Sequence, residues 1–302
     1  MVPQTSTLQA QSSASPTPSP QPSPPSTALA NNPTPGQEAN SANQARCRDW
    51  LAWALETLEA PASALLLDSL SELIWSTVTG RGRLFHNAEH ILHLAEGDDP
   101  LCTLAALFHD SIYVQVDWGL APEVQAHLTP FLVWHGGALC LRPAAELRRI
   151  ADSACVSLLF GLDHGEPQPA ERFNEFLSAL LAVQCLKPLL PQATLAELVV
   201  AIEASIPFRS TAQYVPSEQL YKRLSLANQR FELGLSPGEV EQAIHRAVAF
   251  ANRDVGSFSI ADPVIFLDQT WRLLPELTPA LRNPGQYSIQ DYRTACAGWK
   301  AF

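Results

Sequence analysis

From Arg46 onward, hydrophobic residues recur with the 3.6-residue period of an amphipathic α-helix. The first apolar stripe is formed by Trp50, Leu51, Ala54, Leu55 and Leu58. A second stripe predicts a helix over residues 62–77, ending before Gly80-Arg81-Gly82. The same periodicity predicts further helices near residues 86–96, 100–113, 144–160, 169–186, 192–205, 217–233, 237–256, 262–273 and 288–300.

Local start and stop signals support several of these helices. Ser236-Pro237 and Asp262-Pro263 each combine a capping side chain with a proline suited to the first helical turn. Strand signals are weak, and the stretch 114–142 predicts a loop and a short helix near a pocket mouth. We therefore expect an all-α fold in which residues 46–302 form one domain.

Residues 1–45 have a different composition, rich in Pro, Ser, Thr, Gln and Ala, as in SPTPSPQPSPPS. Such a segment contains too little apolar surface to offset the entropy lost on ordering. It predicts a disordered, partly polyproline-like tail.

Composition narrows the function classes. The hydrophobic fraction of 46% fits a globular chain with a substantial core. A net charge of −11 disfavours generic nucleic-acid binding, although a metal could still attract a small phosphorylated substrate.

Other sequence features indicate the compartment. The six cysteines are scattered and include no C-x-x-C pair, which favours buried, reduced thiols. No apolar run is long enough for a membrane span, and no secretory signal begins the chain. We expect a cytoplasmic protein, and the pattern leaves its oligomeric state open.

Two histidine-containing segments carry the candidate chemistry. In RGRLFHNAEHILHL, His86, His90 and His93 have the four- and three-residue spacings that share a helix face. In LCTLAALFHDSIY, His109-Asp110 interrupts a helix that is apolar nearly all round and is therefore expected to be buried. A buried carboxylate is costly unless it is paired or binds a metal.

A third candidate lies much later in the chain. Val240, Ile244, Ala247 and Ala251 form the apolar stripe of PGEVEQAIHRAVAFANRDVG, and helical spacing places Asp254 next on that face. Instead of binding a metal, Asp254 could form an ion pair with Arg246 or Arg253, or lie in a frayed helix end exposed to water. The competing fourth ligands are Asp152, Asp163 and Asp268.

Together, His90, His109, Asp110 and Asp254 would offer two imidazoles and two carboxylates. This donor set suits a divalent metal ion such as Mn, Fe, Zn, Mg or Co. Whether one or two metals bind is left open, because a second site would need His127, His135 or His164.

The segments FHNAEH, ALFHDSIY and ANRDV resemble those of the HD superfamily of metal-dependent phosphohydrolases, within which the chain looks similar to predicted bacterial hydrolases, cyanobacterial ones included. The first segment also resembles the Y-H-N-x-x-H signature of cyclic nucleotide phosphodiesterases, with Phe85 in place of tyrosine. The resemblance implies an HD-like helical bundle, with His86 as general acid, His90 as a ligand and His109-Asp110 as the HD pair. It implies Asp254 as the late metal aspartate.

On this hypothesis, the metal and Asp110 would activate water against a phosphoester or nucleotide-like substrate, and His86 would protonate the leaving oxygen. His93 either orients a ligand or faces solvent. Candidate substrate contacts are Arg83, Asn87, Tyr113 and Arg209, with Lys222-Arg223 as further cations and Asn87 also expected to hold the His86 ring.

Three alternatives remain at this point. One is a non-catalytic nucleotide- or protein-binding module that keeps the HD frame, and another is an oxidative enzyme that uses two irons on the same scaffold. His86-Asn-Ala-Glu89-His90 also fits the H-x-x-E-H pattern of inverted zinc proteases, in which Glu89 would activate water. That pattern leaves His109-Asp110 unexplained.

Overall fold

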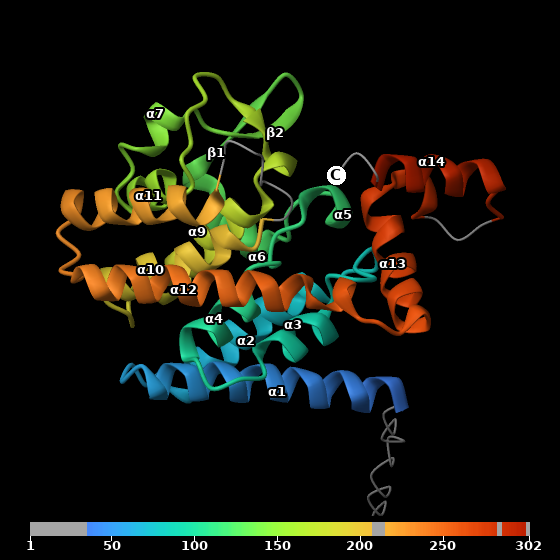
Figure 1. Cartoon of the computed structure of the whole chain (residues 1–302), viewed down its shortest axis with the longest axis horizontal. Coiled ribbons are helices and arrows are strands. Elements are labelled where there is room, and N and C mark those ends of the chain that lie inside the picture. Colours follow the sequence, from blue (N-terminus) through green and yellow to red (C-terminus); the bar gives the residue numbers. More distant parts are fainter. Residues whose placement is uncertain (1–34, 207–214, 283–285, 300–302) are drawn as a thin grey trace, which may run out of the picture.

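The computed structural model describes residues 35–206, 215–282 and 286–299, and over this part of the chain it is built almost entirely of helices (Figure 1). The helices are α1 (Pro35–Thr57), α2 (Ala64–Val78), α3 (Ala88–Ala95), α4 (Pro100–Phe108), α5 (Val114–Asp117), α6 (Pro122–Leu128), α7 (Ala144–Leu147), α8 (Ala151–Leu159), α9 (Asn174–Leu186), α10 (Gln192–Ala204), α11 (Pro216–Arg230), α12 (Pro237–Asp254), α13 (Pro263–Leu277) and α14 (Ile289–Trp299). The strands are β1 (Leu132–His135), β2 (Ala138–Leu141) and β3 (Gln168–Pro169). The all-α prediction is confirmed. Within the described ranges, no helix combines the length and apolar character needed to cross a bilayer.

Helix α4 lies at the centre of the molecule. All residues from Leu101 to Phe108 are buried, as its apolar sequence predicts. It packs against α1, α3 and α10, and α10 in turn packs against α9 and α12. In Figure 1, α1 runs along one side of this bundle and α10 and α12 cross its middle. The last residues of α4 and α12 therefore belong to neighbouring parts of one core.

The first helix begins earlier than the sequence pattern predicted. Residues 35–45, assigned to the tail, belong to α1, whereas residues 1–34 lie outside the described residues. Pro35 suits a first helical turn, and the Ala, Gln and Glu residues that follow have good helix propensity. The expected boundary near Arg46 was wrong because it marked the start of the apolar stripe and not of the helix.

The stretch 114–142 contains a β-hairpin that the sequence analysis did not predict. Strands β1 and β2 pair antiparallel around Gly136-Gly137, and β3 pairs with β2. Both glycines have positive φ, 60° and 82°, as a tight hairpin turn with two left-handed residues requires. The strands are only four residues long and show no alternating pattern, so the hydrophobic period did not reveal them.

Two other predicted helices differ in extent. The helix expected over 144–160 is divided into α7 and α8, and the one expected from 169 begins at Asn174, after β3.

The carboxyl-terminal helices α13 and α14 lie at one end of the bundle (Figure 1). They have a small apolar cluster of their own, formed by Leu274, Leu281 and Ala295. The end of α13 returns to the loop that precedes α3, where the Glu276 side chain accepts backbone hydrogen bonds. This return brings a distant carboxylate beside the histidine segment.

Candidate metal centre

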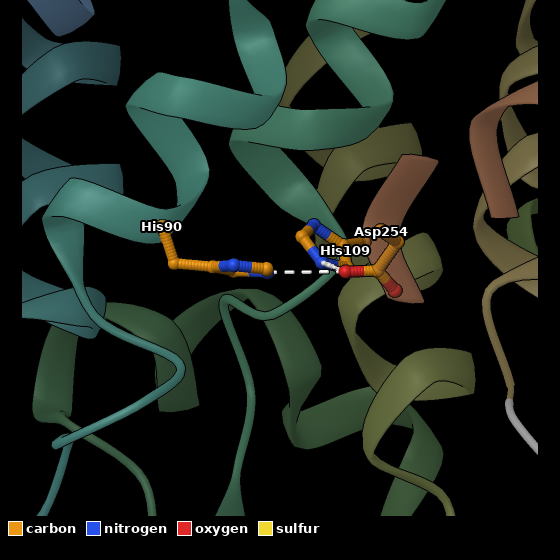
Figure 2. Close-up of side chains that lie close together, drawn as sticks. All are labelled: His90, His109 and Asp254. Atoms are coloured by element: carbon orange, nitrogen blue, oxygen red, sulfur yellow. Dashed lines mark ion pairs between the residues drawn. The ribbon is translucent and has the colours of Figure 1, made fainter. Parts of the chain in front are cut away.

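Three helix ends position the candidate ligands. His90 lies in the first turn of α3, whose amino end is capped by the Asn87 side chain. His109 and Asp110 directly follow α4, and Asp254 is the last residue of α12. Figure 2 shows the His90 ring on one side, with His109 and Asp254 facing it from the other.

The polar atoms of these residues converge. His90 Nε2 lies 3.1 Å from Asp254 Oδ1 and 3.5 Å from Asp110 Oδ2. His109 Nε2 lies 2.9 Å from Asp110 Oδ2 and 3.6 Å from Asp254 Oδ1. The buried group of His90, His109 and Asp254 could hold a metal ion, and Asp110 adds a second carboxylate to it.

The donor atoms point at one another without completing hydrogen bonds. His90 Nε2, His109 Nε2 and Asp110 Oδ2 are buried, and in the described part of the chain none has a hydrogen-bond partner of acceptable geometry. His109 Nδ1 lies 2.9 Å from the Ala106 carbonyl oxygen, a contact that places the neutral ring's proton on Nδ1. The Nε2 lone pair of His109 then faces carboxylate oxygens, an arrangement that a cation would stabilise.

The pKa shifts of His109, Asp110 and Asp254 also indicate a site that favours positive charge. Burial opposes the charged ring of His109, but the carboxylates of Asp110 and Asp254 outweigh it and raise the pKa of His109 well above its ordinary value. Burial likewise opposes ionisation of Asp110 and Asp254, yet the facing histidines lower the pKa of both carboxyl groups. The two carboxylates therefore favour positive charge at this cluster.

His86, the predicted general acid, is held by a residue that the sequence analysis missed. Its Nδ1 lies 2.5 Å from Glu276 Oε2, and the Glu276 side chain is fully buried. Glu276 Oε1 accepts backbone N–H bonds from Leu84, Phe85 and His86 at 2.6, 2.7 and 3.2 Å. Burial opposes protonation of His86, but Asp110 and Glu276 raise its pKa. A single glutamate near a helix end, 190 residues from His86, carries no sequence signal of this role.

Arg83 has a structural placement that does not fit its predicted role in phosphate binding. Its buried guanidinium forms a bidentate pair with Asp117, at 2.9 and 2.6 Å. Its Nη1 donates to the backbone carbonyls of Asp110 and His86. Because these contacts use its donors, Arg83 joins the loop before α3 to the end of α4 instead of facing a ligand.

The other predicted substrate contacts have varied placements. Asn87 does not hold the His86 ring as expected; its side chain caps α3 and donates to the Leu84 carbonyl. Tyr113 is buried, with its ring centroid 5.2 Å from that of His86. Arg209 lies outside the described residues. Arg223 pairs with Glu203 at 3.1 Å, and Lys222 lies on α11, beside a groove between α11 and α12.

The competing metal ligands lie elsewhere. Asp152 pairs with Lys187 at 2.6 Å, Asp268 pairs with Arg272 at 2.9 Å, and Asp163 is exposed.

The additional histidines also fall outside the cluster. His135 is exposed on the hairpin, His127 lies on α6, and His164 Nε2 contacts the Arg142 carbonyl. His93 is 87% exposed and therefore faces solvent.

The protease pattern finds no matching geometry. Glu89 would have to stand between His86 and His90, but its side chain is 80% exposed and reaches toward Arg272. His86 is instead tied to Glu276. The carboxylates beside His90 are those of Asp110 and Asp254.

Comparisons with known proteins add no name to this arrangement: no family model matches the chain, and no curated protein or solved structure is significantly similar to it.

Proposed function

We propose that the chain is a metal-dependent phosphohydrolase that uses His90, His109, Asp110 and Asp254 as metal ligands. One observation carries the proposal: buried imidazole and carboxylate atoms from three helix ends converge, and three of them lack hydrogen-bond partners among the described residues. Two nitrogen and two oxygen donors suit a divalent transition metal. When bound, such a cation supplies a water nucleophile at neutral pH and offsets charge on a phosphoryl oxygen.

The surrounding residues supply the remaining chemistry. Glu276 holds His86 Nδ1, which leaves the Nε2 proton of the charged ring to be donated to a leaving oxygen. The raised pKa of His86, which results from Asp110 and Glu276 outweighing burial, favours the charged ring that donates this proton. Asp110 is the carboxylate assigned to accept the proton of the attacking water. The resemblance of FHNAEH and ALFHDSIY to HD-type hydrolases favours the same roles.

Metal analysis and turnover test this proposal with a matched pair of variants on one helix. His90→Ala should lose the bound metal and reduce phosphoester turnover more than about 100-fold. Changing a residue that only supports a metal ligand costs at most about that much, and removing a ligand itself should cost more. His93→Ala removes an exposed histidine from the same helix and should preserve both. Metal content is measured by elemental analysis, and turnover with p-nitrophenyl phosphate and its diester. A wild-type protein that binds no divalent metal would contradict the proposal.

His86→Ala separates the acid from the ligands. It should retain the metal while turnover falls about 100-fold or more, because general acid catalysis contributes about 10²–10⁴-fold. Loss of metal in this variant would make His86 a ligand instead.

A further inference from the structure

A large groove adjoins His86 from outside the metal centre. It has a volume of about 930 Å³ and lies between α5, the hairpin β1–β2 and the end of α13. Its lining includes Tyr113 and Glu276, two of the residues that contact the His86 ring. Tyr113 and Glu276 therefore lie between the groove and the proposed proton donor, so that a group bound in the groove would be one side chain away from His86.

Two exposed tryptophans line this groove. Trp118, which ends α5, is 81% exposed, and Trp134 of β1 is 69% exposed. Large aromatic rings left in water on one concave surface favour a binding role, since their burial by a ligand is strongly favourable. Each ring contributes a flat apolar face.

The backbone at Trp118 strengthens this interpretation. Its φ of 59° lies in the left-handed region, which a bulky residue adopts at an energetic cost. Trp118 is the left-handed cap residue of α5, and its backbone N–H donates to the Val114 carbonyl. Strained, exposed residues of this kind are concentrated at ligand sites.

The size and polarity of the groove limit what it can hold. Its volume is that of a pocket for a small organic molecule, and much of its lining is apolar, including Leu120 and Leu139. Arg172 adds an exposed cation at this surface. We infer that the groove binds a planar aromatic group, as a nucleoside or an aryl alcohol provides, and that this group is part of the alcohol that leaves when water displaces its oxygen from phosphorus. The inference rests on the proposed function for the reaction, but not for the binding of the ring.

Binding of unphosphorylated probes tests the groove without turnover. Calorimetry with the protein as purified should show adenosine and 1-naphthol binding at least about tenfold more tightly than ribose. Trp118→Ala and Trp134→Ala should each weaken aromatic binding about tenfold, the effect expected of removing one stacking partner. Trp118→Phe keeps a ring and should retain most of the affinity. Trp271→Ala removes an exposed tryptophan that does not line the groove, and it should bind both probes as wild type does.

The probes separate the two sources of the aromatic ring. Stronger binding of adenosine than of 1-naphthol would indicate a nucleoside, and equal binding would indicate any flat aryl group; both outcomes support the inference. Equal affinity for adenosine and ribose would overturn it. It would also be overturned if Trp118→Ala left probe affinity unchanged but altered the mass in solution, because the groove would then be a protein contact.

Kinetics distinguish failure of the groove from failure of the hydrolase. If both phosphoesters are cleaved, kcat/KM is the same for AMP and ribose 5-phosphate and Trp118→Ala affects neither, the assignment of the groove to the leaving group is wrong while hydrolysis stands. If adenosine binds through Trp118 but no phosphoester is cleaved, the proposed reaction is wrong while the aromatic site stands.

Discussion

Helix α12 contributes to two partly buried polar clusters that differ in one essential respect. At its middle, Arg246 donates to Asp99 at 2.8 Å and to Glu197 at 2.5 Å, so donors meet acceptors. At its end, Asp254 faces His90 and His109, which also face Asp110, and several atoms there have no hydrogen-bond partner in the described chain. The first cluster is complete by itself and joins three helices, whereas the second is a group that could hold a metal ion.

The two clusters also lie at opposite ends of α4. Asp99 caps its amino end, where its side chain accepts from the Cys102 N–H, and His109 follows its carboxyl end. The alternative in which Asp254 pairs with Arg246 is therefore wrong, because Arg246 is already engaged two turns away. The difference shows that the kind of partner, and not burial alone, separates an architectural polar cluster from a candidate metal centre.

Removing a proposed metal ligand should have the largest effect on metal content and turnover. If it had none, the cluster at Asp254 would not differ from the cluster at Arg246. Asp110→Asn keeps the side-chain size but removes a negative charge from the metal cluster. We expect loss of metal and a fall in phosphoester turnover of about 1,000-fold or more, beyond the range for an outer-shell change. Elemental analysis and steady-state kinetics provide the measurements. Full metal content and activity in this variant would place Asp110 outside the centre.

Changing Glu276 tests a third polar cluster, formed by the Glu276 carboxylate, the His86 ring and the backbone N–H groups of the loop before α3. Its polar atoms are already hydrogen-bonded, so it is expected to act on the pKa of His86 and not on metal binding. Glu276→Gln removes a charge that raises the pKa of His86, so His86 should lose its proton at lower pH. Since the charged ring is the acid, activity is present below its pKa and lost as pH rises through it. We expect the basic limb of the kcat/KM profile to move to lower pH and turnover at pH 8 to fall about tenfold or more. A profile that keeps its shape would make Glu276 purely structural.

The pH dependence of metal affinity tests whether a cation replaces a proton at the open cluster. Asp110 and Asp254, against the opposing effect of burial, raise the pKa of His109. Below that pKa a metal must displace the proton, so apparent affinity should fall about tenfold for each pH unit of acidification. Calorimetric titration of Mn²⁺ at pH 6, 7 and 8 measures this slope. Affinity independent of pH across that range would contradict a histidine site.

Removing Arg246 from its cluster with Asp99 and Glu197 should have the smallest effect, a loss of stability without loss of metal. Arg246→Met removes the cation between Asp99 and Glu197, and we expect a loss of about 1–2 kcal/mol, between the values for exposed and fully buried pairs. Chemical denaturation measures this change, and metal content should stay at the wild-type level. Arg149→Met, which removes an exposed arginine, is the charge-matched control. Metal loss in Arg246→Met at unchanged stability would show that the two clusters are not independent.

The sequence by itself determined the helical architecture and much of the candidate site. Apolar residues at helical spacing report which face is buried, and this was enough to predict the buried α4 and to place Asp254 on the core-facing side of α12. The positions of His90 and His109 at helix ends came from the structure, because the helices expected over 86–96 and 100–113 are shorter. Capping signals at Ser236 and Asp262 marked the starts of α12 and α13, because a cap depends on neighbours within one turn.

Only the tertiary structure decided which distant groups meet. It brought Glu276 to His86, committed Arg83 to Asp117, and placed Trp118 and Trp134 on one groove. The hairpin around Gly136-Gly137 likewise depended on pairing that short strands do not reveal by their own pattern. The physical reason is common to all: periodicity records the burial of one segment, whereas a contact between segments depends on how every intervening element packs.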